Sequence, residues 1–186
     1  MARVASGATV PGLGESGTPA RPFLKWAGGK AKLAHFILQR APERFNRYHE
    51  PFLGAGAVFF ALRSQRAVAA SLTDVNAALI ETFQVVRDDP DGLSGALAPM
   101  ADRYLPAAHE ERARFYYEVR ASIPSSAAAR AARLIFLNRT CFNGLYRENR
   151  SGRFNVPHGR YVRPAIIDLP LLEACSRALQ LSLIHI

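Results

Sequence analysis

Short apolar runs alternate with a helical pattern in the first half of the chain. Residues 48–53 are apolar apart from His49 and Glu50 and predict a buried strand, and residues 68–72 predict a second strand. A helix-like apolar run at residues 57–62 lies between them. Strand, loop, helix and strand therefore follow one another, which predicts an α/β fold.

Helical spacing of apolar residues dominates the middle of the chain. Asn76 is placed to cap a helix over residues 77–87, and Asp89-Pro90 is placed to start the next segment. The same spacing predicts helices over residues 110–122 and 127–137 and a final helix from Asp168 to about Leu179.

A glycine loop follows the first predicted strand, and a carboxylate follows the second. Gly54 and Gly56 can adopt positive φ and let the backbone approach a ligand, and Asp74 lies twenty positions after Gly54. A carboxylate there can accept hydrogen bonds from both hydroxyls of a ribose. The spacing predicts an adenosine-containing cofactor, although glycine turns followed by an acid also arise by chance.

Two other nucleotide-binding motifs fit this chain less well. Phe59 stands where the dinucleotide fingerprint has its third glycine, which disfavours NAD and FAD. Gly29-Lys30 matches the end of a phosphate-binding loop, but Ala31 replaces the magnesium-binding Ser/Thr and Leu24 replaces the first glycine. These differences disfavour ATP hydrolysis.

Positive charge is concentrated in one stretch. The chain has a net charge of +9, and residues 130–163 contain eight arginines against the single acid Glu148. A genome that favours Arg codons would explain arginine over lysine, but not this clustering. The stretch also predicts a hairpin with Gly152 in its turn, and such a basic, partly aromatic surface is typical of nucleic-acid binding.

Four motifs in one order carry a family resemblance: FLKWAGGK (residues 23–30), EPFLGAGAVF (50–59), SLTDVN (71–76) and LNRTCFNGLYRENRSGRFNVPHGRY (137–161). From about Arg21 to about Leu179 the chain resembles the Dam-type (D12 class) DNA adenine-N6 methyltransferases. The resemblance implies a truncated, Rossmann-like methyltransferase core that uses S-adenosylmethionine. It also implies a helical and β-hairpin part that recognises double-stranded DNA.

The resemblance also assigns residues to the cofactor. Trp26 would border the cofactor, Lys30 would hold its methionine carboxylate, and the loop at residues 51–56 would take the methionine moiety. Asp74 would bind the ribose, and Glu50 would act on the loop or on the cofactor's amino group. The implied cofactor residues are Trp26, Lys30, Glu50, Pro51, Phe52, Gly54, Gly56 and Asp74.

Matching positions in the last motif assign DNA contacts. Arg147 would read a guanine with help from Leu145 and Pro157, and Phe142 and Asn143 would lie near the space left by an extruded adenine. Arg139, Arg160 and Tyr161 would contact phosphates or neighbouring bases. The best-known target of the family is GATC, but one hairpin leaves the recognition sequence open.

The family's catalytic Asp-Pro-Pro-Tyr type motif follows the DNA-reading segment, and this chain contains no Pro-Pro pair. We therefore expect no catalytic residue and no turnover by these 186 residues alone. Residues 181–186, LSLIHI, resemble a translated sequencing-library adapter, and we hypothesise that they are not native. A non-catalytic DNA-binding remnant and a dinucleotide-binding oxidoreductase remain alternatives.

The remaining composition sets the predicted organisation. Residues 1–20 read as a flexible tail, 21–88 as the first half of the cofactor-binding core, 89–165 as the target-recognition region, and 166–180 as a helix returning to the core. The two cysteines and five scattered histidines form no metal pattern, and no apolar stretch is long enough to span a membrane. These features predict a cytoplasmic protein, with a restriction endonuclease as a candidate genetic partner.

Overall fold

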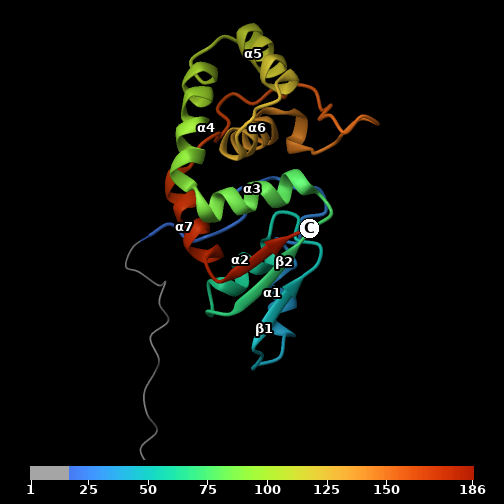
Figure 1. Ribbon diagram of the computed structural model, residues 1–186, viewed down its shortest axis with the longest axis vertical. Helices are drawn as coiled ribbons and strands as arrows, with labels where there is room; N and C mark the ends of the chain where they lie inside the picture. Colours follow the sequence, from blue (N-terminus) through green and yellow to red (C-terminus); the bar gives the residue numbers. More distant parts are fainter. Residues whose placement is uncertain (1–16) are drawn as a thin grey trace, which may run out of the picture.

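We describe the fold from a computed structural model, which describes residues 17–186. Most of the tail predicted at residues 1–20 therefore lies outside the described residues. The described chain has a small sheet at one end and a group of helices at the other, with α3 (Ala77–Asp88) between them (Figure 1).

The sheet has three parallel strands in the order β1 (Arg47–Glu50), β2 (Ala69–Thr73) and β3 (Ser182–His185). The second strand predicted at residues 68–72 is confirmed as β2, and its Ala70 and Leu72 are buried because β2 lies in the middle of the sheet. The first strand predicted at residues 48–53 is present as β1, but it ends at Glu50, and the prediction that it is buried was wrong. Glu50 is the only buried residue of β1, because β1 lies at the edge of this sheet.

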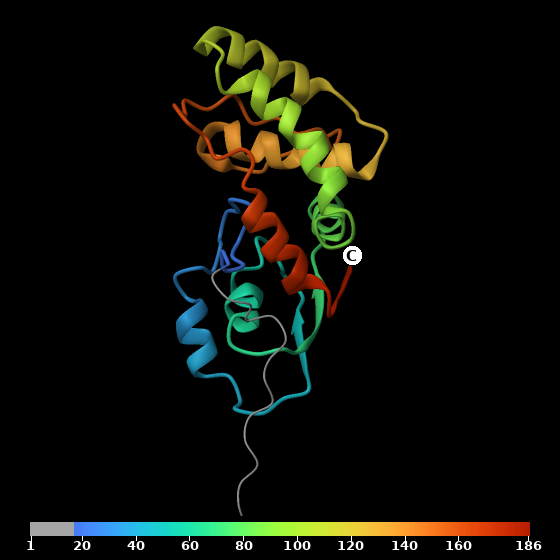
Figure 2. The same ribbon diagram turned by 90° about the vertical axis from the view of Figure 1, so that its left-hand side faces the viewer.

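Helices occur where the apolar spacing predicts them. Besides α3, the helices are α1 (Ala34–Gln39), α2 (Ala57–Arg63), α4 (Pro90–Tyr104), α5 (His109–Ala121), α6 (Ala127–Thr140) and α7 (Leu169–Leu179), with a short 3₁₀ turn, η1 (Phe142–Gly144). Figure 2 shows α7 running from the helical group towards the sheet.

Side-chain caps fix the starts of these helices. The Asn76 Oδ1 accepts from the Leu79 N–H at 2.9 Å, and the Asp168 Oδ1 accepts from the Leu171 N–H at 3.1 Å. These bonds satisfy N–H groups that have no partner inside the helix. Both predicted helix starts are confirmed.

One continuous core joins the sheet and the helices. Leu72 of β2, Phe83 of α3 and Phe136 of α6 are all fully buried within it. The helical group therefore holds its position against the sheet through α3, which places the segment after α6 near the carboxyl ends of β1 and β2 (Figure 1).

The last residues of the chain form β3 rather than a loose end. Ser182 and Ile184 are buried, and the α3 side chains of Arg87 and Gln84 donate to the carbonyls of Ser182 (2.7 Å) and Ile184 (2.9 Å). Strand pairing does not test the origin of these residues, so their non-native origin remains a prediction. The source nucleotides would decide it.

Candidate functional site

A hollow of about 170 Å³ lies at the carboxyl ends of β1 and β2. Its lining includes six of the eight predicted cofactor residues: Trp26, Lys30, Glu50, Phe52, Gly54 and Asp74. Pro51 and Gly56 are not part of this lining, although both belong to the same loop. Residues from three separate motifs thus meet at the edge of the sheet where α/β folds bind ligands.

Asp74 fixes the glycine loop to the end of β2. Its Oδ2 accepts from the Gly54 N–H at 2.9 Å, and its Oδ1 accepts from the Asn76 N–H at 3.0 Å. Each carboxylate oxygen has a second lone pair, so these two bonds leave acceptor capacity for a ligand hydroxyl.

The glycine requirement of the loop is geometric. Gly54 and Gly56 have φ of +51° and +70°, a region that side-chain-bearing residues rarely adopt. A Cβ on Gly54 would lie 3.1 Å from Cδ1 of Trp26, and a Cβ on Gly56 would lie 3.2 Å from the Phe60 ring. Gly54 therefore admits Trp26 to the hollow, whereas Gly56 serves the packing beneath it.

Glu50 connects β1 to the start of α2. Its buried Oε2 accepts from the Tyr48 hydroxyl at 2.9 Å and from the Phe59 N–H at 3.2 Å. Burial raises the pKa of Glu50, although these two bonds and nearby Lys30 act in the opposite direction. The carboxylate thus ties β1 to the start of α2, and its predicted action on the loop or on the cofactor's amino group stays a prediction.

The predicted hairpin is present in reduced form. Two isolated antiparallel bridges, Cys141–His158 and Glu148–Phe154, replace continuous strands, and the Asn155 N–H donates to the Arg147 carbonyl at 3.0 Å. Gly152 lies in the turn with φ of +69°, as predicted. We call residues 142–161 the DNA-reading segment, after its predicted role. It extends from the helical group in orange (Figure 1).

The arginines of the basic stretch divide into two groups. Three of them, all in α6, make bonds within the protein. Arg130 pairs with Glu81 at 2.6 Å. Arg133 donates to the Val119 carbonyl at 2.9 Å, and Arg139 donates to the Phe23 carbonyl at 2.6 Å. The other five are exposed: Arg147, Arg150, Arg153, Arg160 and Arg163. All five follow α6, and all but Arg163 lie on the DNA-reading segment, which concentrates positive charge there.

Arg139 is therefore not brought together with the other predicted DNA contacts. Burial, and secondarily nearby Arg21, lowers the pKa of its guanidinium, and it lines a small recess with Asp168. Its DNA contact stays a prediction.

The remaining predicted DNA residues lie on one segment. Phe142, Asn143, Leu145, Pro157 and Arg160 are exposed, and Tyr161 is half-buried. Arg147 is exposed and donates its Nε to the Asn155 Oδ1 at 2.7 Å, which holds the guanidinium in one orientation. Asn143 has φ of +55°, a conformation that asparagine tolerates better than most residues.

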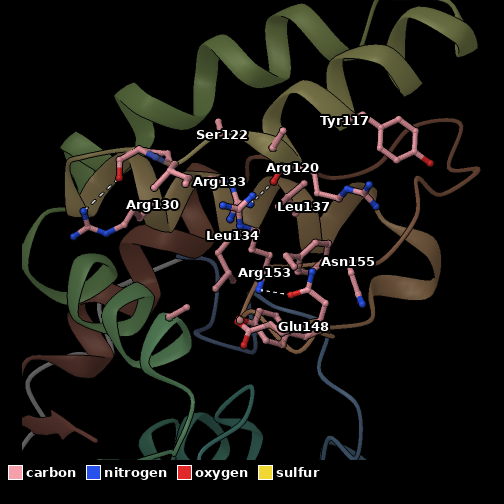
Figure 3. Close-up of a pocket in the computed structure, with 18 of the residues that line it drawn as sticks. Tyr117, Arg120, Ser122, Arg130, Arg133, Leu134, Leu137, Glu148, Arg153 and Asn155 are labelled. Carbon is pink, nitrogen blue, oxygen red and sulfur yellow. Dashed lines mark hydrogen bonds between the residues drawn. The ribbon is translucent and has the colours of Figure 1, made fainter.

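A larger hollow of about 510 Å³ lies between α5, α6 and the DNA-reading segment (Figure 3). Arg120, Arg130 and Arg133 line it, but each is bonded to protein carbonyls or to Glu81. These three arginines therefore hold α5, α6 and neighbouring elements together, while Arg153 of the DNA-reading segment also lines the hollow and is exposed.

Sequence reasoning missed two residues that join the two sites. Asn138 is 1% exposed and bonds to both Lys25 and Gly144, and Tyr146 stacks on Trp26 with ring centroids 5.0 Å apart. Neither belongs to a spacing pattern, so the only signal that could have found them is their place among the arginines of residues 130–163.

Two further expectations concern the described residues only. Within residues 17–186, no three His, Cys, Asp or Glu side chains group closely enough to hold a metal ion. In the same part of the chain, no helix combines the length and apolar character needed to cross a membrane. Cys141 and Cys175 are both buried and unpaired there.

Comparison with known proteins gives one consistent result. The family model described as D12 class N6 adenine-specific DNA methyltransferase matches residues 26–186. The type II methyltransferase M.MjaIII of Methanocaldococcus jannaschii is 39% identical over 171 residues, which cover 86% of this chain and 59% of that protein.

Two other relatives agree. The type II methyltransferase M1.LlaDCHI of Lactococcus lactis is 39% identical over 165 residues, covering 86% of this chain and 55% of the relative. The DNA adenine methylase of Haemophilus influenzae is 38% identical over 143 residues, covering 76% and 48%. The chain thus spans about half the length of the curated relatives it matches.

Proposed function

We propose that this chain, which belongs to the D12 class of N6 adenine-specific DNA methyltransferases, binds S-adenosylmethionine at the sheet edge and duplex DNA through residues 142–161. It would thereby supply the cofactor-binding and DNA-reading parts of an enzyme that methylates adenine N6. S-adenosylmethionine would supply the methyl group. The cytoplasm would be the place of this activity, and a restriction endonuclease is a candidate partner.

The observation that carries the proposal is the convergence of Trp26, Gly54 and Asp74 in one hollow. Asp74 has acceptor capacity left for the ribose hydroxyls, and the Lys30 ammonium at the same hollow suits the methionine carboxylate. The Trp26 ring offers an apolar wall to the adenosine. No group that would cradle a phosphate is needed, since the cofactor carries a sulfonium instead.

The helix start beside this hollow disfavours a dinucleotide. In dinucleotide-binding folds a pyrophosphate lies at the helix N-terminus. Here the Phe59 N–H at the start of α2 already donates to the Glu50 carboxylate, and a second anion there would meet like charge. We therefore favour a methyltransferase over the oxidoreductase alternative.

Exposed arginines support the DNA-reading role of residues 142–161. Arg147 would donate to guanine O6 and N7 with Leu145 and Pro157 beside it, and Arg160 would contact phosphates. GATC is the target we propose to test first.

The chain contains no Pro-Pro pair, and so no Asp-Pro-Pro-Tyr type motif to draw on the amino hydrogens of adenine. We propose that the chain binds both partners without transferring the methyl group. Methyl incorporation into DNA by the purified chain would contradict this. A non-catalytic DNA-binding remnant predicts in addition that the gene encoding this chain contains no such proline pair.

Calorimetry with sinefungin, an unreactive S-adenosylmethionine analogue, tests the cofactor site. We expect sinefungin to bind and NAD not to bind. Asp74→Ala should weaken sinefungin binding at least about tenfold, because both the ribose acceptor and the Gly54 anchor are lost. The matched substitution Asp102→Ala, on the exposed side of α4, should leave binding unchanged. Binding of NAD without sinefungin would overturn the proposal.

Duplex binding measured by fluorescence anisotropy tests the DNA-reading role. Arg147→Ala should relax the preference at one base pair by about 1–3 kcal/mol, because a bidentate guanine contact is lost. Arg160→Ala should weaken binding to all sequences and reduce its salt dependence by about one phosphate contact. Uniform loss in Arg147→Ala would instead mark Arg147 as a phosphate contact.

A further inference from the structure

Residues 23–26 join the 170 Å³ hollow, here called the cofactor pocket, to the DNA-reading segment. The buried Asn138 side chain accepts from the Lys25 N–H at 2.8 Å and donates to the Lys25 carbonyl at 2.7 Å. The same amide nitrogen donates to the Gly144 carbonyl at 3.1 Å. One side chain thus holds the backbone before Trp26 and the backbone before Leu145 at a fixed separation.

Close packing reinforces this junction. Gly144 has φ of +62°, and a Cβ there would lie 2.7 Å from Cβ of Lys25. The Lys25 ammonium lies 4.0 Å above the ring centroid of Tyr161, at the far end of the DNA-reading segment. Both ends of that segment therefore contact the residue that precedes Trp26.

The most direct contact between the two sites is aromatic. Tyr146 lies between Leu145 and Arg147 in sequence, and its ring stacks on Trp26 with centroids 5.0 Å apart and planes 29° apart. Phe154, across the hairpin, contacts the Tyr146 ring in an edge-to-face arrangement with ring centroids 5.6 Å apart. Trp26 in turn fills the space beside Gly54, which Asp74 anchors.

Tyr146 is also held in place through its hydroxyl. The hydroxyl donates to the Glu148 Oε1, and burial together with this bond raises the pKa of Tyr146 to about 12. The ring therefore stays neutral near pH 7. A displacement of Trp26 by a ligand must move Tyr146 or be resisted by it.

Resting on the function proposed above, we propose that Tyr146 is a positioning residue that couples occupancy of the cofactor pocket to placement of the DNA-reading segment through its stack on Trp26. By linkage, the coupling is reciprocal: bound duplex must tighten cofactor binding by the same factor by which the cofactor tightens duplex binding. An aromatic pair supplies enough interaction for a factor of about three to ten.

The chain offers a site-specific readout, since Trp26 is its only tryptophan. Sinefungin is titrated by calorimetry with and without a short duplex that contains GATC, and Trp26 emission is recorded in each state. In the wild-type chain we expect the duplex to lower the sinefungin Kd about threefold to tenfold and to change the Trp26 emission.

Variants at position 146 separate the ring from the hydroxyl. Tyr146→Ala should bring the coupling factor to about one, while each ligand alone still binds within about threefold of wild type. Tyr146→Phe keeps the stack and should keep the coupling. Tyr117→Ala is the matched control, because Tyr117 lines the same 510 Å³ hollow as Tyr146 but belongs to α5. It should retain wild-type coupling.

The outcomes are distinct. Failure of sinefungin to bind the wild-type chain overturns the proposed function and this inference with it. Binding of both ligands without coupling, or coupling that survives Tyr146→Ala, overturns this inference alone. Should Tyr146→Ala melt early by circular dichroism, Tyr146→Leu keeps apolar bulk without the aromatic stack and must show the same loss of coupling.

Discussion

The cofactor pocket and the DNA-reading segment are built in different ways. The pocket is fixed by backbone N–H groups bonded to the carboxylates of Asp74 and Glu50, on loops that parallel strands and a helix hold in place. The DNA-reading segment is held by two isolated antiparallel bridges, Cys141–His158 and Glu148–Phe154, and carries four exposed arginines. A small ligand requires a preformed shape, whereas a long polyanion requires charge on a surface that can adjust to it.

The largest effect should come from the residue that joins the two regions. Asn138→Leu removes the buried side chain that bonds the Lys25 N–H, the Lys25 carbonyl and the Gly144 carbonyl. We expect the free energy of unfolding to fall by about 3 kcal/mol or more, because each buried unsatisfied group costs about 1–3 kcal/mol. Urea unfolding followed by circular dichroism measures this.

Asn149 provides the matched comparison within the DNA-reading segment. Its exposed Oδ1 accepts from the N–H groups of Ser151 and Arg153, each at 3.0 Å, in the turn of the hairpin. Asn149→Leu should cost about 1 kcal/mol or less, because water can replace these bonds. Equal losses in the two variants would show that Asn138 does not have the special role that its position indicates.

The same contrast explains what the sequence could predict. The glycine loop and Asp74 are local motifs at the ends of apolar runs, so their meeting at one sheet edge follows from strand order. The capped starts of α3 and α7 were predicted for the same reason. Burial of the first strand was predicted wrongly, because apolar content does not show whether a strand lies at the edge of a sheet.

The remaining features of the site depend on tertiary contacts, which the sequence does not show. The sequence gives Arg133, Arg139 and Arg147 the same chemistry, and only their surroundings separate two structural arginines from an exposed one. Likewise, the stack of Tyr146 on Trp26 joins residues 120 positions apart and has no periodic signal.

An effect of intermediate size is expected at two glycines with positive φ, Gly54 in the pocket and Gly152 in the DNA-reading segment. Gly54 has φ of +51° with Trp26 close to its missing Cβ, whereas Gly152 has φ of +69° with no atom within 4 Å of that point. Gly54→Ala should weaken sinefungin binding about tenfold, because the backbone strains and Trp26 must shift. Gly152→Ala should leave sinefungin binding unchanged and cost about 1 kcal/mol of stability.

Calorimetry measures both affinities, and urea unfolding measures both stabilities. An equal loss of sinefungin affinity in the two variants would mean that the pocket responds to strain anywhere in the chain. In that case the pocket would not be the locally fixed site that the Gly54–Asp74 bond indicates.

The smallest expected effect concerns Glu50, which lines the pocket, and the pH dependence of the free energy of unfolding. Burial raises the pKa of Glu50 above its ordinary value of 4.5, so the folded chain binds this proton more tightly than the unfolded chain does. The stability that Glu50 contributes is therefore fully present below about pH 4.5 and is lost as the pH rises through the folded pKa.

Glu50→Gln keeps an acceptor for Tyr48 and Phe59 but does not titrate. The unfolding free energy of the variant, measured in urea from about pH 4 to pH 7, should accordingly rise relative to wild type as the pH increases. Glu43→Gln, at an exposed position before β1, should show no such trend. A constant difference between Glu50→Gln and wild type would mean that the bonds from Tyr48 and Phe59 offset burial fully, and that the pocket wall carries a charge at no cost to the fold.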